Sequence, residues 1–263
     1  MKNITKAQLY QFVKSREVLL IILGVNIICT AIALMFSMEN SVAFIGNTGS
    51  AYAANSMSIT VTFIYMLPSV ICGKICADDF QDKTINYEAA SGSLRWQSYF
   101  GRAIPSLILS LILCLITIGL PLMIVTAMHG WGDLVTPSSA IIRIFTVLLP
   151  IFRVSCFNIM MSFIIKKDKF VVVISCIGSV FASFISGMSR KITYGMFSQV
   201  DIMKLLNYKY YITYGLNDEK NVWGIYDSTI DISALTQISV VSLIVGIIYI
   251  CVGYFYHKHD DLN

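Results

Sequence analysis

The sequence predicts an all-α membrane protein with six transmembrane helices and with both the N- and C-termini in the cytoplasm. Three observations support this prediction. The 263 residues are 56% hydrophobic and only 13% charged, which leaves too little polar surface for a soluble domain of this size. Six apolar stretches reach about the 20 residues that a helix needs to cross a bilayer. Positive charges alternate between the segments that join these stretches.

A single transmembrane domain over residues 1–263 is expected. Its six spans cover approximately residues 18–38, 57–77, 103–128, 141–165, 170–188 and 236–256. The second and fourth spans carry cations. Lys74 and Arg143 lie near span ends, where a long side chain can reach water, whereas Arg153 lies near the middle of its span.

Lysine and arginine residues set the orientation, because they are retained on the cytoplasmic side. Basic segments, at residues 2–16, 83–102 and 166–169, alternate with segments that lack Lys and Arg, at 37–56 and 129–140. The last connection is basic on the predicted outer side, but basic residues far from helix ends have little influence on orientation. The first apolar run is longer than the core of a signal peptide, so we expect it to persist as the first span.

Residues 2–17 are expected to form a short helix that lies along the membrane surface. Leu9, Phe12 and Val13 provide the side that faces the lipid, and lysines flank them. Because three basic residues fall close to the same side, a basic flank that only fixes the topology is the alternative.

The loop after the second span has too few apolar residues to enter the bilayer. It begins with acidic residues, which suit a helix N-terminus; Gly92 then offers a break, and residues 95–102 begin a second amphipathic approach to the membrane. We therefore expect a short helix at the cytoplasmic surface that binds a partner, with a solvated turn as the alternative. The residues predicted to form the contact surface are Asp78, Asp79, Phe80, Lys83, Thr84, Ile85, Tyr87 and Glu88.

The long connection before the last span, residues 189–236, is expected to form a re-entrant helical hairpin. Apolar residues at positions 196, 200, 203 and 206 recur with helical spacing, and four tyrosines between 208 and 214 suit a membrane interface. A compact extracellular loop is the alternative.

Catalytic motifs are missing from the sequence. It contains no G-x-x-x-x-G-K-[ST] phosphate-binding loop, no H-E-x-x-H and no G-x-S-x-G. Cys72 and Cys76 lie one helical turn apart, but no His or carboxylate on that turn completes a four-ligand metal site. We expect a chain that is not an enzyme, has no catalytic residue, cofactor or metal ion of its own, and binds no nucleic acid.

Over almost its whole length the chain resembles the permease subunits of the ABC-2 family of ATP-binding-cassette transporters. The shared features are the basic interfacial helix, six spans, an acidic loop after the second span and a long connection before the sixth. The family's loop carries an acidic residue, a Gly-Thr pair, a hydrophobic segment, a small residue and an arginine, in that order. The corresponding residues here are Asp79, Lys83-Thr84, Ile85, Ser93 and Arg95. Asp replaces the usual Glu, Lys83 replaces the Gly, and no Pro precedes Arg95.

The resemblance implies that separate ATPase subunits bind ATP and magnesium and dock on the cytoplasmic face. Residues 78–88 would be the coupling helix and residues 2–17 a second contact. Dimerisation of the ATPases would switch two permease halves between inward and outward states. A second permease chain, identical or related, is therefore implied, and the implied location is the plasma membrane, which in bacteria is the cytoplasmic or inner membrane.

The implied function is the export of a hydrophobic or amphipathic substrate, as in the small permeases that expel antimicrobial peptides and confer bacteriocin immunity. No residue in the sequence identifies the substrate. The alternative from another class is a membrane sensor or channel that needs no ATPase.

Arg153 is the most costly residue of the chain, because an arginine at the centre of a span costs about 2.5 to 3.5 kcal/mol on insertion scales. It is expected to face protein or water rather than lipid. We expect Arg153, together with Asn158, to line the translocation path or the interface between two permease chains. A structural cation that pairs with loop carboxylates is the alternative.

Overall fold

The computed structural model describes residues 2–38, 48–55, 57–81, 84–85, 88, 92–188, 197–214, 222–227, 229 and 231–259. Along the chain, the described elements are α1 (Lys2–Lys14), α2 (Arg16–Met38), α3 (Gly49–Asn55), η1 (Met57–Thr60), α4 (Val61–Cys72), η2 (Gly73–Ala77), α5 (Asp78–Gln81), α7 (Arg95–His129), α8 (Pro137–Ile165), α9 (Asp168–Met188), α10 (Ser198–Leu206), β1 (Lys209–Tyr214), β2 (Val222–Asp227) and α11 (Ile232–His259). The element η1 is a 3-10 helix and η2 is a π-helix.

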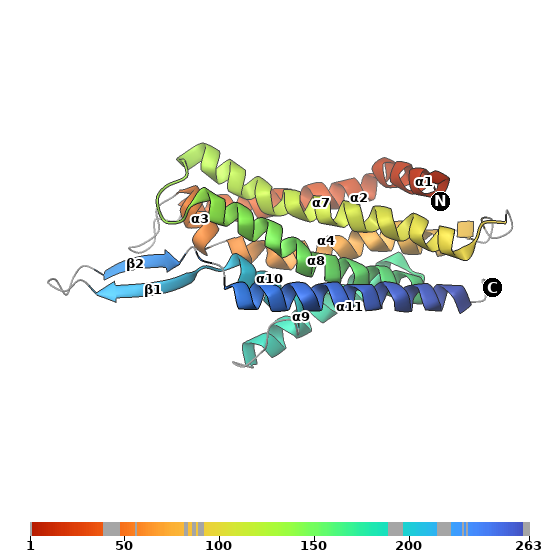
Figure 1. Cartoon of the computed structure of the whole chain (residues 1–263). Helices are drawn as coiled ribbons and strands as arrows, with labels where there is room; N and C mark the ends of the chain where they lie inside the picture. Colours follow the sequence, from red (N-terminus) through yellow and green to blue (C-terminus); the bar gives the residue numbers. More distant parts are fainter. Residues whose placement is uncertain are drawn as a thin grey trace.

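The helices α7, α8 and α11 run along the length of an elongated bundle (Figure 1). Helix α1 begins, and helix α11 ends, at the same end of this bundle, which we call the terminal end. The β1–β2 hairpin projects from the opposite end, which we call the hairpin end. The two ends of the chain thus lie at one end of the bundle, as an even number of membrane crossings would require.

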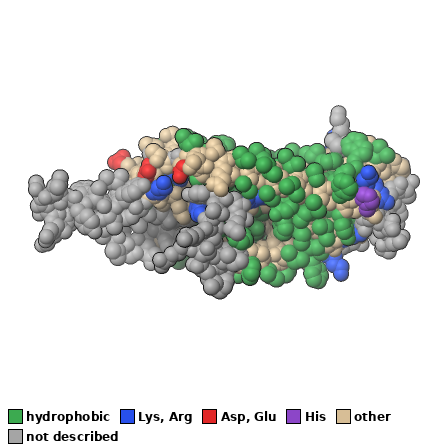
Figure 2. Space-filling model, turned by 60° about the horizontal axis from the view of Figure 1, so that its bottom comes forward, with side chains coloured by type: hydrophobic (Ala, Val, Ile, Leu, Met, Phe, Trp, Pro, Cys, Tyr) green, Lys and Arg blue, Asp and Glu red, His purple; other side chains and the backbone are tan. Residues whose placement is uncertain are grey.

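Four of the described helices are long and apolar enough to cross a membrane: α2, α7, α8 and α11. On the face shown in Figure 2, a broad band of hydrophobic side chains covers the middle of the bundle, between ends that carry charged side chains. In water such a band would be strongly unfavourable, so the chain is a membrane protein. Helix α7 has 35 residues. It is therefore about 50 Å long and extends beyond a hydrocarbon core of about 30 Å.

Two predicted spans differ from these four. The span expected at residues 57–77 is divided into η1, α4 and η2, with Pro68 inside α4 and a π-helical turn after it. Proline removes one backbone donor, and a π-turn inserts an extra residue, so both interrupt regular helical bonding. The span expected at residues 170–188 is α9, which is inclined to the long helices (Figure 1). The count of six spans stays a prediction.

The break predicted at Gly92 is confirmed, because this residue has φ 85°. Only glycine adopts that left-handed region freely. Residues 95–102, expected to begin an amphipathic approach to the membrane, are the first part of α7, which continues without a break into the membrane-crossing part. Helix α7 therefore links the terminal end directly to the rest of the bundle.

Helix α4 lies inside the bundle, where it packs against α7, α8 and α9. Its contact with α7 uses small polar side chains. The Cys72 thiol lies 3.7 Å from the hydroxyl oxygen of Ser110, and the Cys76 thiol, in η2, donates to Ser106 at 3.6 Å. Small residues let helices approach closely in a bilayer, where apolar side chains gain little by leaving lipid. The cysteines thus serve helix packing.

The connection before the last helix differs in part from the expected helical hairpin. Its first half is helical, as predicted, and forms α10, which packs against α8, α9 and α4. Its second half is an antiparallel β-hairpin in which Lys209 lies opposite Asp227 and Tyr214 opposite Val222. The β1 sequence Lys-Tyr-Tyr-Ile-Thr-Tyr is rich in aromatic and β-branched residues, which favour strands over helices. Met196, included in the helical pattern, lies outside the described residues.

The helix expected at the N-terminus is present as α1. Leu9 and Val13 are exposed, as a lipid-facing side requires, but Phe12 is buried against the rest of the chain. Helix α1 packs on the start of α7, where a Cβ added at Gly101 would lie 3.0 Å from a methyl group of Ile4. The prediction for Phe12 is wrong because one side of α1 packs against α7 rather than against lipid.

A stripe of α11 packs against α8. Its buried residues are Ala234, Ile238, Ser242, Gly246, Gly253 and His257. At Gly253, an added Cβ would lie 2.8 Å from the hydroxyl oxygen of Tyr99 and 3.2 Å from the Cα of Met160. The two helices therefore need glycine at this position.

We predict that Gly253→Ala lowers the stability of the protein by about 1 to 3 kcal/mol, because the added methyl group overpacks the contact with α8. Thermal unfolding in detergent micelles measures the effect. Gly24→Ala is the matched control. No atom lies within 4 Å of a Cβ added there, so the better helix propensity of alanine should leave stability unchanged or raised. Equal unfolding temperatures for the two variants would contradict the prediction.

Candidate functional site

Arg102, in the first part of α7, is the centre of a buried cluster of charges at the terminal end. Its side chain has 0% exposure and faces two carboxylates. The Nε atom donates to Asp79 Oδ2 at 2.8 Å, and the two Nη atoms donate to the two carboxylate oxygens of Glu88 at 2.8 and 2.9 Å. This bidentate geometry is the strong form of an ion pair. The charge of Arg102 is therefore neutralised within the chain.

The cluster joins three parts of the chain that are distant in sequence. Gln8 of α1 donates a hydrogen bond to the carboxylate of Asp79. Ser98 of α7 accepts a bond from Arg102 at 2.7 Å and donates to Glu88 at 3.1 Å. We call Arg102, Asp79, Glu88, Gln8 and Ser98 the Arg102 cluster. It holds α1, α5, Glu88 in the loop after α5, and the start of α7 as one unit.

The described residues of the predicted contact surface have different surroundings. Asp79 is 3% exposed within the Arg102 cluster, and Ile85 is buried. Asp78 is half-buried and pairs with Lys74 at 2.7 Å, while Phe80 packs edge-on against Phe163.

Glu88 is half-buried, and Thr84 is exposed, with its hydroxyl donating to the Asp79 carbonyl at 3.1 Å. Lys83 and Tyr87 lie outside the described residues. Of the described members, Thr84 is thus the one that faces outward.

The sequence interpretation missed Arg102, Gln8 and Ser98 as members of a site. From the sequence, Arg102 is expected to be one of the basic residues that set orientation and the end of the amphipathic segment 95–102. The spacing of Ser98 and Arg102, which places both on one side of a helix, is the signal that could have identified the cluster. The chain also exposes two large apolar residues at this end, Leu94 at 56% and Trp96 at 44%. They lie just before and within the first turn of α7, next to the Arg102 cluster in sequence.

A second buried ion pair joins α8 to α10. Arg153 is 4% exposed, and its Nη2 lies 2.7 Å from Asp201 Oδ2. Its Nε donates to the hydroxyl of Ser198, the first residue of α10, at 2.6 Å. Arg153 therefore pairs with a carboxylate of the connection before the last span. This is the structural role that the sequence analysis gives as the alternative for Arg153. A position on a translocation path stays a prediction.

Asn158 is expected to line the translocation path or the interface between two permease chains together with Arg153, but its hydrogen bonds are to residues other than Arg153. Its amide donates to the Val154 carbonyl of its own helix at 3.0 Å, and its oxygen accepts a bond from Ser175 of α9. Asn158 therefore links α8 to α9, one helical turn from the ion pair that links α8 to α10.

Arg143, expected to reach water from a span end, is instead 4% exposed. It donates to three carbonyl oxygens at 3.0 to 3.1 Å, those of Leu205, Asn207 and Thr229, and its guanidinium lies 4.0 Å from the centre of the Tyr208 ring. The guanidinium thereby holds the end of α10 and the segment after β2. The expected path to water is blocked because α10 covers this part of α8.

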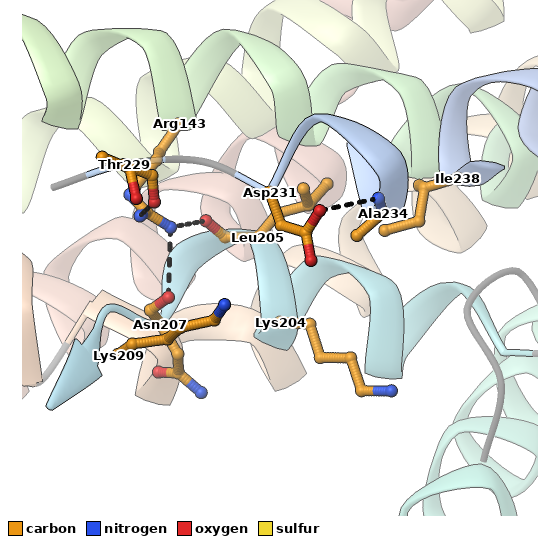
Figure 3. A pocket seen from close by; sticks show the side chains of 9 residues that line it. All are labelled: Arg143, Lys204, Leu205, Asn207, Lys209, Thr229, Asp231, Ala234 and Ile238. Atoms are coloured by element: carbon orange, nitrogen blue, oxygen red, sulfur yellow. Dashed lines mark hydrogen bonds between the residues drawn. The ribbon is translucent and has the colours of Figure 1, made fainter. Parts of the chain in front are cut away.

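A cavity of about 60 Å³ lies beside Arg143 (Figure 3). It is lined by Arg143, Lys204, Leu205, Asn207, Lys209, Thr229, Asp231, Ala234 and Ile238. Hydrogen bonds from Ser233 and Ala234 lower the pKa of Asp231, and hydrogen bonds from Thr229 lower that of Asp227 nearby. Both carboxylates are therefore negative at neutral pH.

Metal binding is not a feature of these clusters. Among the described residues, no group of three or more His, Cys, Asp or Glu side chains is placed to hold a metal ion. The chemistry available at both ends is the binding and pairing of charges.

Comparison with known proteins adds no relative. No protein-family model matches the chain, and a search of curated proteins finds no similar sequence.

We predict that Arg102→Gln lowers the stability by about 3 to 5 kcal/mol, because Asp79 and Glu88 would then be left without their buried cation. The apparent unfolding temperature in detergent micelles should fall by about 10 °C or more.

Lys74→Gln removes a partly exposed ion pair with Asp78 and is the matched control. Such pairs contribute about 0 to 1 kcal/mol, so its unfolding temperature should stay close to that of the unaltered chain. A small effect of Arg102→Gln would contradict a structural role for the cluster.

We also predict that Arg153→Gln and Asp201→Asn each destabilise the protein by about 3 to 5 kcal/mol and that the double variant is less destabilised than the sum. Each single variant leaves one buried charge without its partner, whereas the double variant leaves none. A cycle of unfolding measurements on the four proteins gives the coupling. Strictly additive effects would show that the two side chains do not depend on each other.

Proposed function

We propose that the chain is the permease subunit of an ATP-driven exporter of the ABC-2 type in the plasma membrane, which in a bacterium is the cytoplasmic membrane. Separate ATPase subunits would bind ATP and magnesium at the terminal end, and a second permease chain, identical or related, would complete the pathway. The observation that carries this proposal is the Arg102 cluster. It ties a surface helix and a loop to the start of a helix that runs through the whole bundle.

A partner that moves the loop would also move α7, because Arg102 of α7 donates charged hydrogen bonds to both Asp79 and Glu88. The same end of α7 also holds α11. The Arg95 guanidinium donates to the Lys258 carbonyl at 2.7 Å, in the last turn of α11. Displacement of the loop would thus act on two long helices together.

The contacts continue toward the hairpin end. Helix α11 packs along α8, and α8 holds α10 through Arg153 and Asp201. Packed elements of this kind change between discrete arrangements rather than deforming continuously. In the proposed cycle, α10 therefore shifts when the ATPase subunits close, and Arg153 contributes by holding α10 rather than by binding substrate.

The docking surface for the ATPase would consist of exposed residues, namely Thr84, Leu94 and Trp96. Asp79, matched to the family's acidic residue, would act from inside by fixing the loop. A buried carboxylate cannot contact a partner without leaving Arg102, and that would be costly.

The proposed substrate is hydrophobic or amphipathic, such as an antimicrobial peptide. An apolar groove of about 470 Å³ lies between α2 and α7, lined by Leu23, Asn26, Ile27, Thr30, Ala31, Leu34, Leu120 and Ile124. The amide oxygen of Asn26 has no hydrogen-bond partner there. An apolar wall with few polar groups suits an amphipathic molecule.

The test is to purify the tagged chain from gently solubilised membranes of its native host, to identify the proteins that accompany it, and to measure ATP hydrolysis. We expect an ATP-binding-cassette subunit to co-purify. Thr84→Arg should reduce its recovery about tenfold or more, since a long charged side chain would enter the docking surface and a loss of about 1.4 kcal/mol is tenfold in affinity.

Thr136→Arg is the matched control, because the same substitution is made at an exposed threonine directly before α8, the helix that begins at the hairpin end (Figure 1). It should leave the recovery unchanged, and both variants should unfold at similar temperatures. Recovery of the chain with no ATPase subunit and no ATP hydrolysis would instead favour a membrane sensor or channel.

A further inference from the structure

Three arginine side chains of the described part of the chain are almost fully buried: Arg102, Arg143 and Arg153. Two of them are neutralised by carboxylates of the chain, Arg102 by two and Arg153 by one. Arg143 differs. Among the described residues, no carboxylate oxygen lies within 4.0 Å of its guanidinium, and its partners are neutral carbonyl groups and an aromatic ring.

Carbonyl groups satisfy the donors of a guanidinium but do not cancel its charge. A charge held inside a protein without a counter-charge is unfavourable unless an ion or solvent supplies one. The Nε donor of Arg143 also has no hydrogen-bond partner. Arg143 is therefore the one of the three without a carboxylate in direct contact, and among the described carboxylates only the more distant negative charge of Asp227 acts on it.

The cavity beside Arg143 has the charge and size for an anion. Its lining includes three cationic side chains, of Arg143, Lys204 and Lys209, and a single carboxylate, of Asp231. That carboxylate is already used, because its Oδ1 accepts bonds from the Ser233 hydroxyl at 2.7 Å and from two backbone amides at the start of α11. A cavity of about 60 Å³ holds more than one water molecule, since one needs only about 10 to 15 Å³.

The position of the cavity suits the level of lipid headgroups. Arg143 is the seventh residue of α8, so it lies about 9 Å along the helix from its start at the hairpin end. Large apolar residues next in sequence to the lining residues are exposed: Ile232, which follows Asp231, is 74% exposed, and Met203, which precedes Lys204, is also exposed. The cationic side chains of the cavity could bind the phosphate of a phospholipid, and the exposed apolar side chains could contact its acyl chains.

We propose that this cavity, formed between α8, α10, β1 and α11, binds a phosphate group carried by a phospholipid of the leaflet at the hairpin end (Figure 3). Lys204 and Lys209 bind the phosphate oxygens, and the buried charge of Arg143 supplies the attraction behind them. The bound lipid holds α10, the hairpin and α11 together. The proposal requires a membrane-embedded chain but no ATPase partner, so it is independent of the proposed function.

The experiment measures binding to the full-length chain in an uncharged detergent. The probes are a short-chain phosphatidylglycerol, the diacylglycerol of the same chain length, which lacks the phosphate, and inorganic phosphate at constant ionic strength. Binding is followed by the increase in unfolding temperature with probe concentration and by retention of radiolabelled lipid. We expect the phosphatidylglycerol to bind and the diacylglycerol to bind at least about tenfold more weakly.

The test variant is Lys204→Gln with Lys209→Gln, because both side chains are exposed and their loss should leave the fold intact. Arg143 is left in place because it also holds three backbone carbonyls. The control is Lys167→Gln with Lys169→Gln, two exposed lysines of which the first directly precedes α9 and the second lies in its first turn. We expect the Kd of phosphatidylglycerol to rise about tenfold in the test variant and to stay unchanged in the control.

Each remaining outcome decides the matter. If inorganic phosphate binds as tightly as the lipid and the test variant loses it, the phosphate site is supported and its occupant is the free anion. If the two lysine variants bind phosphatidylglycerol equally, or if the diacylglycerol binds as well as the phospholipid, the phosphate site is overturned and Arg143 serves only to hold backbone carbonyls.

Discussion

A guanidinium group keeps its charge in any protein environment, so every arginine buried in a membrane bundle must be surrounded by acceptors. In this chain that constraint determines where the parts outside the long helices lie. The Arg102 cluster joins α1, α5 and the loop after α5 to the start of α7. Arg153 holds α10 against α8, and Arg143 fixes the end of α10 and the segment after the hairpin.

The two ends of the bundle differ in how their charges are balanced. At the terminal end, Arg102 faces two carboxylates with bidentate geometry, which is a closed and rigid arrangement. At the hairpin end, Arg143 donates to three carbonyl oxygens, lies over the Tyr208 ring and borders a cationic cavity. This difference suits the proposed exporter. Rigid ion pairs at the terminal end would transmit the movement of the ATPase subunits, and exchangeable contacts at the hairpin end would let α10 change its position.

Several local predictions from the sequence are confirmed because they depend on neighbours in the chain. The break at Gly92 follows from the conformational freedom of glycine, and α10 follows from apolar residues at helical spacing. Others are wrong because packing decided them. Phe12 has the pattern of a lipid-facing residue, yet it is buried because α1 lies on α7. The segment at 209–214 was placed in a helix, although its aromatic and β-branched residues favour the strand that it forms.

The sequence by itself determined that this protein belongs in a membrane and where along the chain its long helices lie. Both follow from composition and from the length of the apolar runs. It also identified Arg153 as costly. Only the tertiary structure decided which acid meets which arginine, because Asp201 lies 48 residues from Arg153 and Glu88 lies 14 residues before Arg102. An ion pair needs its two charged groups within about 4 Å of each other. The number of residues between them in the sequence does not show whether a folded chain brings them that close.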